Sequence, residues 1–149
     1  MAHNQDWLEW LESLNASGVE YVIVGAVALA HHGWVRYTGD LDVYVRPSVA
    51  NAERVIAALR RFGFGSLNVT VADLSAPDRV IQLGFPPSRI DLLTAIDGVS
   101  WDEAWQNAVV GEYAGVAVRF ISRSDLVRNK RSTGRPQDNA DADRLDGAN

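Results

Sequence analysis

The chain has 149 residues, of which 47% are hydrophobic and 22% are charged, with no cysteine and a formal net charge of −5. This length and apolar content predict one folded domain and exclude a disordered chain. The absence of cysteine excludes a disulfide framework, a thiolate metal site and a cysteine nucleophile. The first residues are polar and acidic, and the longest apolar run, 22–30, is far shorter than a membrane span of about 20 residues. We therefore expect a single cytoplasmic domain over 1–149, without membrane contact.

Hydrophobic periodicity and turn residues predict five elements in the first half of the chain. The opening segment has apolar residues at helical spacing, and glycine follows it. Two later runs are rich in β-branched and aromatic residues, which favour strands. The predicted elements are a helix over 6–15 within the N-terminal segment 1–18, strands over 19–24 and 41–45, a short helix over 26–32, and a helix between an N-cap at Ser48 and a stop at Gly63.

The second half predicts two hairpins separated by a helix, followed by terminal helices. The segment 64–77 is open between a short strand and a helical turn. The remaining predicted elements are strands over 79–85 and 89–96, a helix capped by Ser100, strands over 109–113 and 116–121, a basic helix over 126–131 that starts at Ser124 or Asp125, and a final helix over 135–145. Residues 124–149 are thus basic and then acidic. Because strands and helices mix without strict alternation, we predict an α+β fold, a mixed β-sheet flanked by helices.

The most informative motif is a pair of aspartates at the start of a predicted strand. Asp40 and Asp42 are two residues apart, so their side chains point to the same face. Two close carboxylates repel each other unless a cation lies between them, and Mg²⁺ binds through one or two carboxylates plus substrate phosphates. The motif therefore indicates a metal site, although such triplets also occur on solvated strand faces and in loops.

Two further features favour the metal interpretation. Gly25 and Ala26 lie where a buried strand turns into a helix, and small residues there let a phosphate approach the backbone. The alternative is that Gly25 only makes the turn. Asp91 lies within an apolar strand, where a carboxylate is costly unless it is paired or binds metal. The alternative interpretation of Asp91 is that it forms an ion pair with Arg89 or Arg79. A phosphate cradle and three carboxylates are the parts needed for two-metal phosphoryl or nucleotidyl transfer.

This order of motifs resembles the minimal nucleotidyltransferases of the DNA polymerase β-like superfamily, in particular the MNT-like branch around AbiE-type toxins. The superfamily has Gly-Ser or Gly-Gly at a helix start, then D-x-D, then a third aspartate; the branch adds Arg-x-Thr before D-x-D and a late Lys followed by Arg-Pro-x-Asp-x-x-Asp. The matching residues are Gly25-Ala26, Arg36, Thr38, Asp40, Asp42, Asp91, Lys130, Arg135, Pro136, Asp138 and Asp141. The resemblance extends over 19–145 and implies the nucleotidyltransferase fold. Ala26 departs from the pattern because it has no hydroxyl to hold a phosphate.

The resemblance implies magnesium-dependent transfer of a nucleoside monophosphate from a nucleoside triphosphate such as ATP onto a hydroxyl group. By the same resemblance, Asp40, Asp42 and Asp91 hold two Mg²⁺ ions, and Asp91 also helps to deprotonate the acceptor. Pyrophosphate leaves as the α-phosphorus is attacked in line. The implied nucleotide-binding residues are Gly25, Ala26, Arg36, Thr38 and Lys130. The acceptor is open between tRNA or another RNA, a protein and an aminoglycoside-like small molecule, and the setting is a toxin–antitoxin system.

Other polar and aromatic residues have simpler interpretations. His31 and His32 are adjacent on a helix and diverge by about 100°, so we expect packing and not a shared metal. Asp138 and Asp141 are expected to anchor Arg135 or Arg131. Trp34, beside the D-x-D loop, is a candidate for stacking on a base.

Residues 119–135 hold six cations and one acid, so this acidic chain can still present a basic surface to a polyphosphate or an RNA. The alternative for this basic segment is a solvated helix face. A second functional hypothesis is a weakly active or inactive nucleotidyltransferase-fold module that acts as an antitoxin or binds a partner protein.

Overall fold

The computed structural model describes residues 4–35, 38–64 and 68–147. Its centre is one six-stranded sheet with the strand order β3-β4-β2-β1-β6-β5. The strands are β1 (Tyr21–Val24), β2 (Asp40–Val45), β3 (Val80–Leu83), β4 (Arg89–Leu93), β5 (Val109–Tyr113) and β6 (Val116–Phe120). Strand β1 is antiparallel to β2 and parallel to β6, and β2 is parallel to β4, while β3 with β4 and β5 with β6 form antiparallel pairs. The predicted α+β class with a mixed sheet is confirmed, and so are both predicted hairpins.

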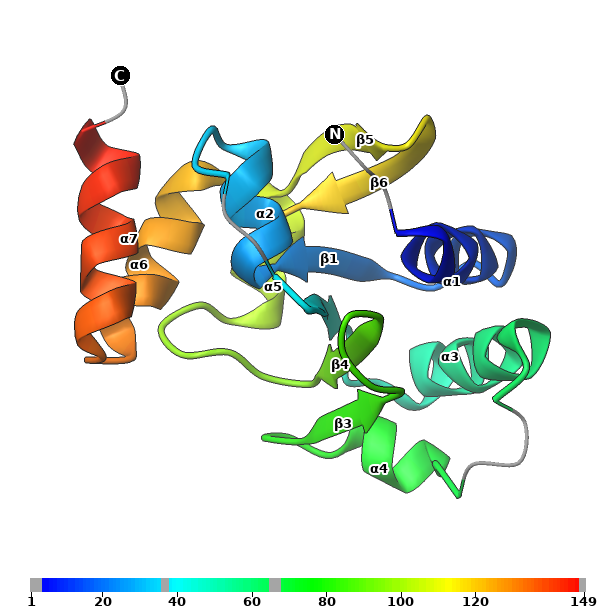
Figure 1. Cartoon of the computed structure of the whole chain (residues 1–149). Coiled ribbons are helices and arrows are strands. Elements are labelled where there is room, and N and C mark those ends of the chain that lie inside the picture. The colour runs from blue at the N-terminus through cyan, green and yellow to red at the C-terminus, as the bar shows by residue number, and fades with distance from the viewer. Residues whose placement is uncertain (1–3, 36–37, 65–67, 148–149) are drawn as a thin grey trace.

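The helices lie around this sheet. They are α1 (Gln5–Ala16), α2 (Gly25–His31), α3 (Val49–Phe62), α4 (Val71–Ser75), α5 (Trp101–Asn107), α6 (Arg123–Ser132) and α7 (Pro136–Gly147). Figure 1 shows α1 and α3 side by side at one side of the sheet and α6 and α7 side by side at the other. None of the helices in the part of the chain that the structure describes is long and apolar enough to cross a bilayer.

Side-chain caps decide where several helices begin. The predicted cap Ser48 accepts a hydrogen bond from the Asn51 N–H, and Ser100 forms a full capping box with Glu103. The predicted start of α6 at Ser124 or Asp125 is wrong, because Ser122 is the cap and accepts from the backbone N–H of Asp125. The segment left open, 64–77, contains the short helix α4; residues 65–67 of it lie outside the described chain.

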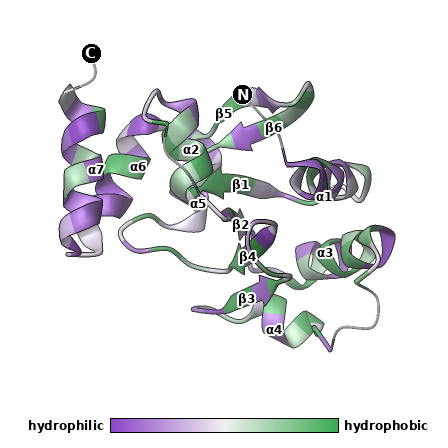
Figure 2. Ribbon diagram, viewed as in Figure 1, coloured by the Kyte–Doolittle hydropathy of each residue, from purple (hydrophilic) through white to green (hydrophobic). Residues whose placement is uncertain are grey.

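Large apolar side chains from the sheet and from α1, α3 and α5 form the core. Trp10, Leu11 and Leu14 of α1 are fully buried, and Trp101 of α5 is 7% exposed. Figure 2 shows α6 and α7 as mainly hydrophilic, in contrast to the hydrophobic β1 strand. Leu126, Ala142 and Leu145 are the buried apolar residues of this pair, while its polar contacts join α6 to α7 and to the loop after β4, beside the candidate site.

A fully buried asparagine joins α3 to the sheet. The Asn51 side chain accepts a hydrogen bond from the Glu20 N–H at 2.8 Å and donates to the carbonyls of Glu20 at 3.0 Å and Arg46 at 3.1 Å. These backbone groups flank the paired strands β1 and β2. The two carbonyls also accept backbone hydrogen bonds, that of Glu20 from the Arg46 N–H and that of Arg46 from the Ser48 N–H. Asn51 therefore supplies the acceptor for the Glu20 N–H, and both carbonyls satisfy its own buried amide.

We expect Asn51→Leu to lower the free energy of unfolding by about 1–3 kcal/mol, since it keeps the side-chain size, leaves the Glu20 N–H without its acceptor and removes two further hydrogen bonds. Urea unfolding followed by circular dichroism measures the change. Gln106→Ala, at an exposed position of α5, is the control and should change stability by less than about 0.5 kcal/mol. An equal effect of the two substitutions would contradict this role of Asn51.

Candidate active site

Two neighbouring parallel strands bring the candidate carboxylates together. In the register of β2 and β4, Asp42 lies opposite Asp91 and Asp40 lies opposite Arg89. Residues two apart on a strand share a face, and register partners on adjacent strands do so as well. Asp40, Asp42, Asp91 and Arg89 therefore occupy one face of the sheet, at the start of β2 and of β4.

Arg89 links the two outer carboxylates. Its Nη2 donates to Asp40 Oδ2 at 2.9 Å and to Asp91 Oδ2 at 3.1 Å, and its Nε donates to Asp91 Oδ1 at 3.1 Å. This is the Arg89 ion pair that the sequence left open as an alternative for Asp91. The two-pronged geometry fits a planar guanidinium and fixes the orientation of the Asp91 carboxylate.

Asp42 is the carboxylate that Arg89 does not contact. Within the described chain, no side chain or backbone N–H donates a hydrogen bond to its carboxylate. Burial raises the pKa of Asp42 to about 7, and the nearby charges of Asp91 and Asp40 raise it further, against smaller opposing effects of Arg89 and Lys130. An ionised Asp42 is therefore an unfavourable charge that a cation at the site would stabilise.

Gly25 allows Asp42 to sit where it does. Its backbone has φ +66, and a Cβ atom built on it would lie 2.1 Å from Asp42 Oδ2. The turn from β1 into α2 therefore requires glycine for its left-handed backbone and for the close approach of the carboxylate. The turn explanation considered from the sequence therefore applies, while the approach of a phosphate to this backbone stays a prediction.

A cleft of about 420 Å³ opens at this end of the sheet. Its floor comes from the strands, and its walls come from the loop after β4 and from the α6–α7 pair. The lining residues are Val24, Gly25, Asp42, Val80, Asp91, Leu93, Ala95, Ile96, Asp97, Asn129, Lys130, Thr133, Arg135 and Asp138. The cleft thus joins the carboxylates of the D-x-D strand and of β4 to the C-terminal helices.

Lys130, the single lysine of the chain, is buried in the cleft wall. Its ammonium lies 3.2 Å from Asp138 Oδ1 and 3.2 Å from Asp141 Oδ2. Burial raises the pKa of Asp138, but a hydrogen bond from Thr133 and the charge of Lys130 outweigh it, so the net shift is downward. The expected anchoring of Arg135 by Asp138 is present at 2.6 Å, whereas Asp141 pairs with Lys130.

Thr38 and Ala26, two of the other proposed nucleotide-binding residues, lie near the first residues of β2 and α2. The Thr38 hydroxyl accepts from the Asp40 N–H and donates to the Asp40 carbonyl, so it braces the start of β2. Ala26 lies half-buried in the first turn of α2. Arg36 lies outside the described residues.

The histidines and Trp34 make packing contacts and are not among the lining residues of the cleft. His31 stacks on Phe120 with ring centroids 4.0 Å apart, and a ring nitrogen of His32 lies 2.7 Å from the Ile121 carbonyl. The expectation of packing is confirmed. The guanidinium of Arg144 lies 4.1 Å from the centre of the Trp34 ring, so one face of the candidate base-stacking residue is already covered.

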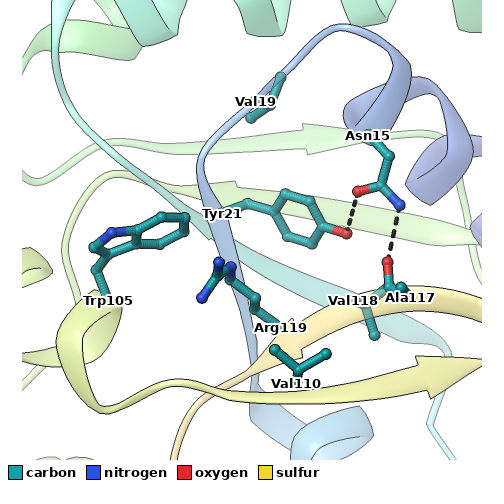
Figure 3. Close-up of a pocket in the computed structure, with 8 residues that line it drawn as sticks. All are labelled: Asn15, Val19, Tyr21, Trp105, Val110, Ala117, Val118 and Arg119. Carbon is teal, nitrogen blue, oxygen red and sulfur yellow. Dashed lines mark hydrogen bonds between the residues drawn. The ribbon is translucent and has the colours of Figure 1, made fainter.

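A second pocket, of about 220 Å³, lies between α1, α5 and the β5–β6 hairpin (Figure 3). The Tyr21 hydroxyl donates to Asn15 Oδ1 at 2.9 Å, and Asn15 Nδ2 donates to the Ala117 carbonyl at 2.9 Å. Burial raises the pKa of Tyr21 above its usual range. The Arg119 guanidinium lies 4.3 Å from the centre of the Trp105 ring. These contacts join α1 to the β5–β6 hairpin. They also give the polar groups of the pocket partners within the protein.

The carboxylates fit one divalent cation better than two. Both Asp91 oxygens and Asp40 Oδ2 are engaged by Arg89, which leaves Asp40 Oδ1 and the two Asp42 oxygens. Among the described residues, no group of three metal-ligating side chains is arranged to hold an ion. Two carboxylates on one strand face suit Mg²⁺ when substrate phosphates and waters complete its shell.

Comparison with known proteins adds no relative: no family model matches the chain, and no curated protein matches its sequence significantly. The functional argument therefore rests on the motifs and on the geometry of the cleft. Sequence reasoning missed the double role of Arg89 and the positions of Asp97 and Asn129 in the cleft wall. The Arg-x-Asp spacing on β4 was an available signal for Arg89, because strand alternation places residues 89 and 91 on one face.

We expect Gly25→Ala to lower the free energy of unfolding by about 3 kcal/mol or more, because the new Cβ collides with Asp42 and φ is positive. Gly18→Ala is the matched control: φ is +71 there too, but a Cβ meets nothing within 4 Å, so only about 1 kcal/mol is expected. Urea unfolding compares the two variants, and equal losses would show that the contact with Asp42 is unimportant.

We expect Asp42→Asn to stabilise the metal-free protein at pH 8. The folded-state pKa of Asp42 is raised, so the native state keeps a proton that the unfolded chain has released between about pH 4 and pH 7. Stability should therefore fall as the pH rises through this window, by up to about 4 kcal/mol, and the variant should lack this part of the decline. Urea unfolding at pH 5 and pH 8 in EDTA measures it; parallel pH profiles of the two proteins would contradict it.

Proposed function

We propose that this protein is a magnesium-dependent nucleotidyltransferase of the DNA polymerase β-like type. The observation that carries the proposal is the gathering of Asp40, Asp42 and Asp91 on one sheet face, at a cleft whose opposite wall holds Lys130. Resemblance in motif order supports the same class. Perturbed carboxylates in a cleft are typical of catalytic sites.

Each residue of the site has a separate role in the proposed reaction. Asp40 and Asp42 would hold Mg²⁺, which polarises the phosphates and stabilises the charge that develops on them during transfer. Gly25 borders the cleft, so its backbone is accessible to the nucleotide. The Lys130 ammonium donates a hydrogen bond to Asp138 and lies 3.2 Å from Asp141, and its positive charge at the cleft would attract a phosphate.

The transfer itself requires a base and an in-line attack. Asp91, oriented by Arg89, takes the proton of the acceptor hydroxyl on a carboxylate lone pair that the two Arg89 hydrogen bonds leave free. The acceptor oxygen then forms a bond to the α-phosphorus while the bond to the pyrophosphate oxygen breaks, and pyrophosphate leaves with the electron pair. The products are the nucleotidylated acceptor and pyrophosphate. We place this activity in the cytoplasm, as expected from the sequence, and in a toxin–antitoxin setting, as the resemblance implies.

Asp42→Asn should abolish magnesium-dependent binding of nucleoside triphosphate, because it removes a ligand charge from the centre of the site. Calorimetric titration with each of the four triphosphates, with and without Mg²⁺, measures this. Loss of stability cannot explain the result, since the variant is expected to be at least as stable as the parent. Asp78→Asn, which removes an exposed carboxylate elsewhere, is the control and should bind normally. Absence of binding by the parent protein at millimolar nucleotide would overturn the proposal.

A second candidate function is that of an inactive module that binds a partner protein. Two observations favour it: Ala26 offers no hydroxyl to a phosphate, and Arg89 already occupies both oxygens of Asp91. The same titration separates the candidates, because an inactive module shows no magnesium-dependent nucleotide binding and is unaffected by Asp42→Asn.

A further inference from the structure

The side chain of Arg89 occupies the gap between the carboxylates of two neighbouring strands. Its Nη2 atom donates to both Asp40 Oδ2 and Asp91 Oδ2, at 2.9 and 3.1 Å, and its Nε donates to Asp91 Oδ1 at 3.1 Å. A single nitrogen thus bridges β2 and β4, as a metal ion shared by two carboxylates does. A divalent ion in the same gap would lie beside the guanidinium and be repelled by it. Arg89 therefore supplies positive charge where these carboxylates would otherwise require a bound cation.

The fold holds Arg89 in this gap. The residue belongs to β4, its backbone N–H donates to the Gly39 carbonyl at 3.2 Å, and its register partner on β2 is Asp40. Asp91 is 7% exposed and forms an ion pair with Arg89. Withdrawal of the guanidinium would leave this buried charge uncompensated, which is strongly unfavourable. Because an arginine is charged at every physiological pH, Arg89 is a cation that the folded chain always carries.

The charges of the cluster leave room for one divalent ion. Three carboxylates carry three negative charges, of which Arg89 offsets one and a single divalent ion offsets the other two. The oxygens that Arg89 does not engage are Asp40 Oδ1 and the two oxygens of Asp42. Asp42 lines the cleft and lies against the Gly25 backbone, away from the Arg89 contacts. A second divalent ion would have to compete with the guanidinium for the oxygens of Asp91.

We propose that Arg89 is a built-in substitute for one of the two metal ions that the resemblance implies, so that the site binds one divalent cation instead of two. This inference deepens the proposed function and rests on it for the nucleotide and for the transfer. Arg89 is a positioning residue, because it acts through Asp91 and fixes the orientation of that carboxylate. A guanidinium that cannot dissociate keeps Asp91 oriented before Mg²⁺ and the nucleotide bind.

The number of bound ions tests this substitution. Mn²⁺ replaces Mg²⁺ as the probe, and equilibrium dialysis with a non-hydrolysable analogue of each of the four nucleoside triphosphates gives the ions and nucleotides bound per chain. We expect one Mn²⁺ per bound nucleotide for the parent and two for Arg89→Gln, since the variant frees the oxygens of Asp40 and Asp91. Electron paramagnetic resonance distinguishes a spin-coupled pair within the cluster from an ion bound elsewhere on the surface. Two ions in the parent, or one in Arg89→Gln, overturn the inference.

Two further variants separate the charge of Arg89 from its contribution to folding. Arg46→Gln is the matched control, because the Arg46 side chain is 34% exposed against 29% for Arg89 and also forms an ion pair, with Glu20. It should bind one Mn²⁺, as the parent does. Arg89→Lys keeps the positive charge, so one ion is expected there too, and two ions would overturn the inference. If Arg89→Gln does not fold, the counts for the parent and for Arg89→Lys decide the question.

The same dialysis, repeated with Mn²⁺ alone, distinguishes failure of this inference from failure of the proposed function. Two ions bound with nucleotide by the parent overturn the inference and support the proposed function. A parent that binds neither nucleotide nor Mn²⁺, beside an Arg89→Gln variant that binds Mn²⁺ alone, overturns the proposed function and supports the role of Arg89 as the cation of the site. Absence of bound ions from both proteins overturns both proposals.

Discussion

Repulsion among three carboxylates on two adjacent strands is the constraint around which this end of the molecule is organised. Parallel pairing of β2 with β4 places Asp42 opposite Asp91 and leaves Asp40 one pleat away. Arg89 offsets the repulsion from within β4, because its register position lies opposite Asp40 and two residues from Asp91. The backbone of Gly25, in the turn between β1 and α2, also lies against the Asp42 carboxylate. One arginine and one glycine thus make the cluster compatible with a folded sheet.

Electrostatic contacts also join the two C-terminal helices to each other, while Leu126 and Leu145 pack into the hydrophobic core. Lys130 projects from α6 into the cleft wall and is held by two aspartates of α7, so one buried cation joins the two helices beside the carboxylate cluster. Breaking a buried pair by removing one partner leaves an uncompensated charge, which is why such pairs fix geometry even where they add little net stability. The net charge of −5 is therefore a poor guide to the surface. Acids and bases of the last 30 residues largely neutralise each other.

Sequence reasoning succeeded where the determinant is local and failed where it is not. The mixed sheet, both hairpins and the caps at Ser48 and Ser100 follow from alternation, turn residues and hydrogen bonds within three positions. The shared face of Asp40 and Asp42 is local too. The pairing of Lys130 with a second helix depends on how two elements pack, so the basic segment looked like a free surface. Asn51 gave no signal, because its three partners belong to Glu20 and Arg46, which tertiary structure brings to it.

Asp42 is the residue that packing alone does not explain. Asp42 is half-buried, and no described residue donates a hydrogen bond to its carboxylate, an arrangement that lowers stability. Natural proteins tolerate such a cost mainly where function requires it. The neighbouring residues reinforce this reasoning: Arg89 reaches both outer carboxylates and leaves the middle one open, and Gly25 gives it room. Among the described residues, Asp42 is the one carboxylate of the three that Arg89 leaves unpaired, and it borders the cleft; the proposed cation site rests on this arrangement.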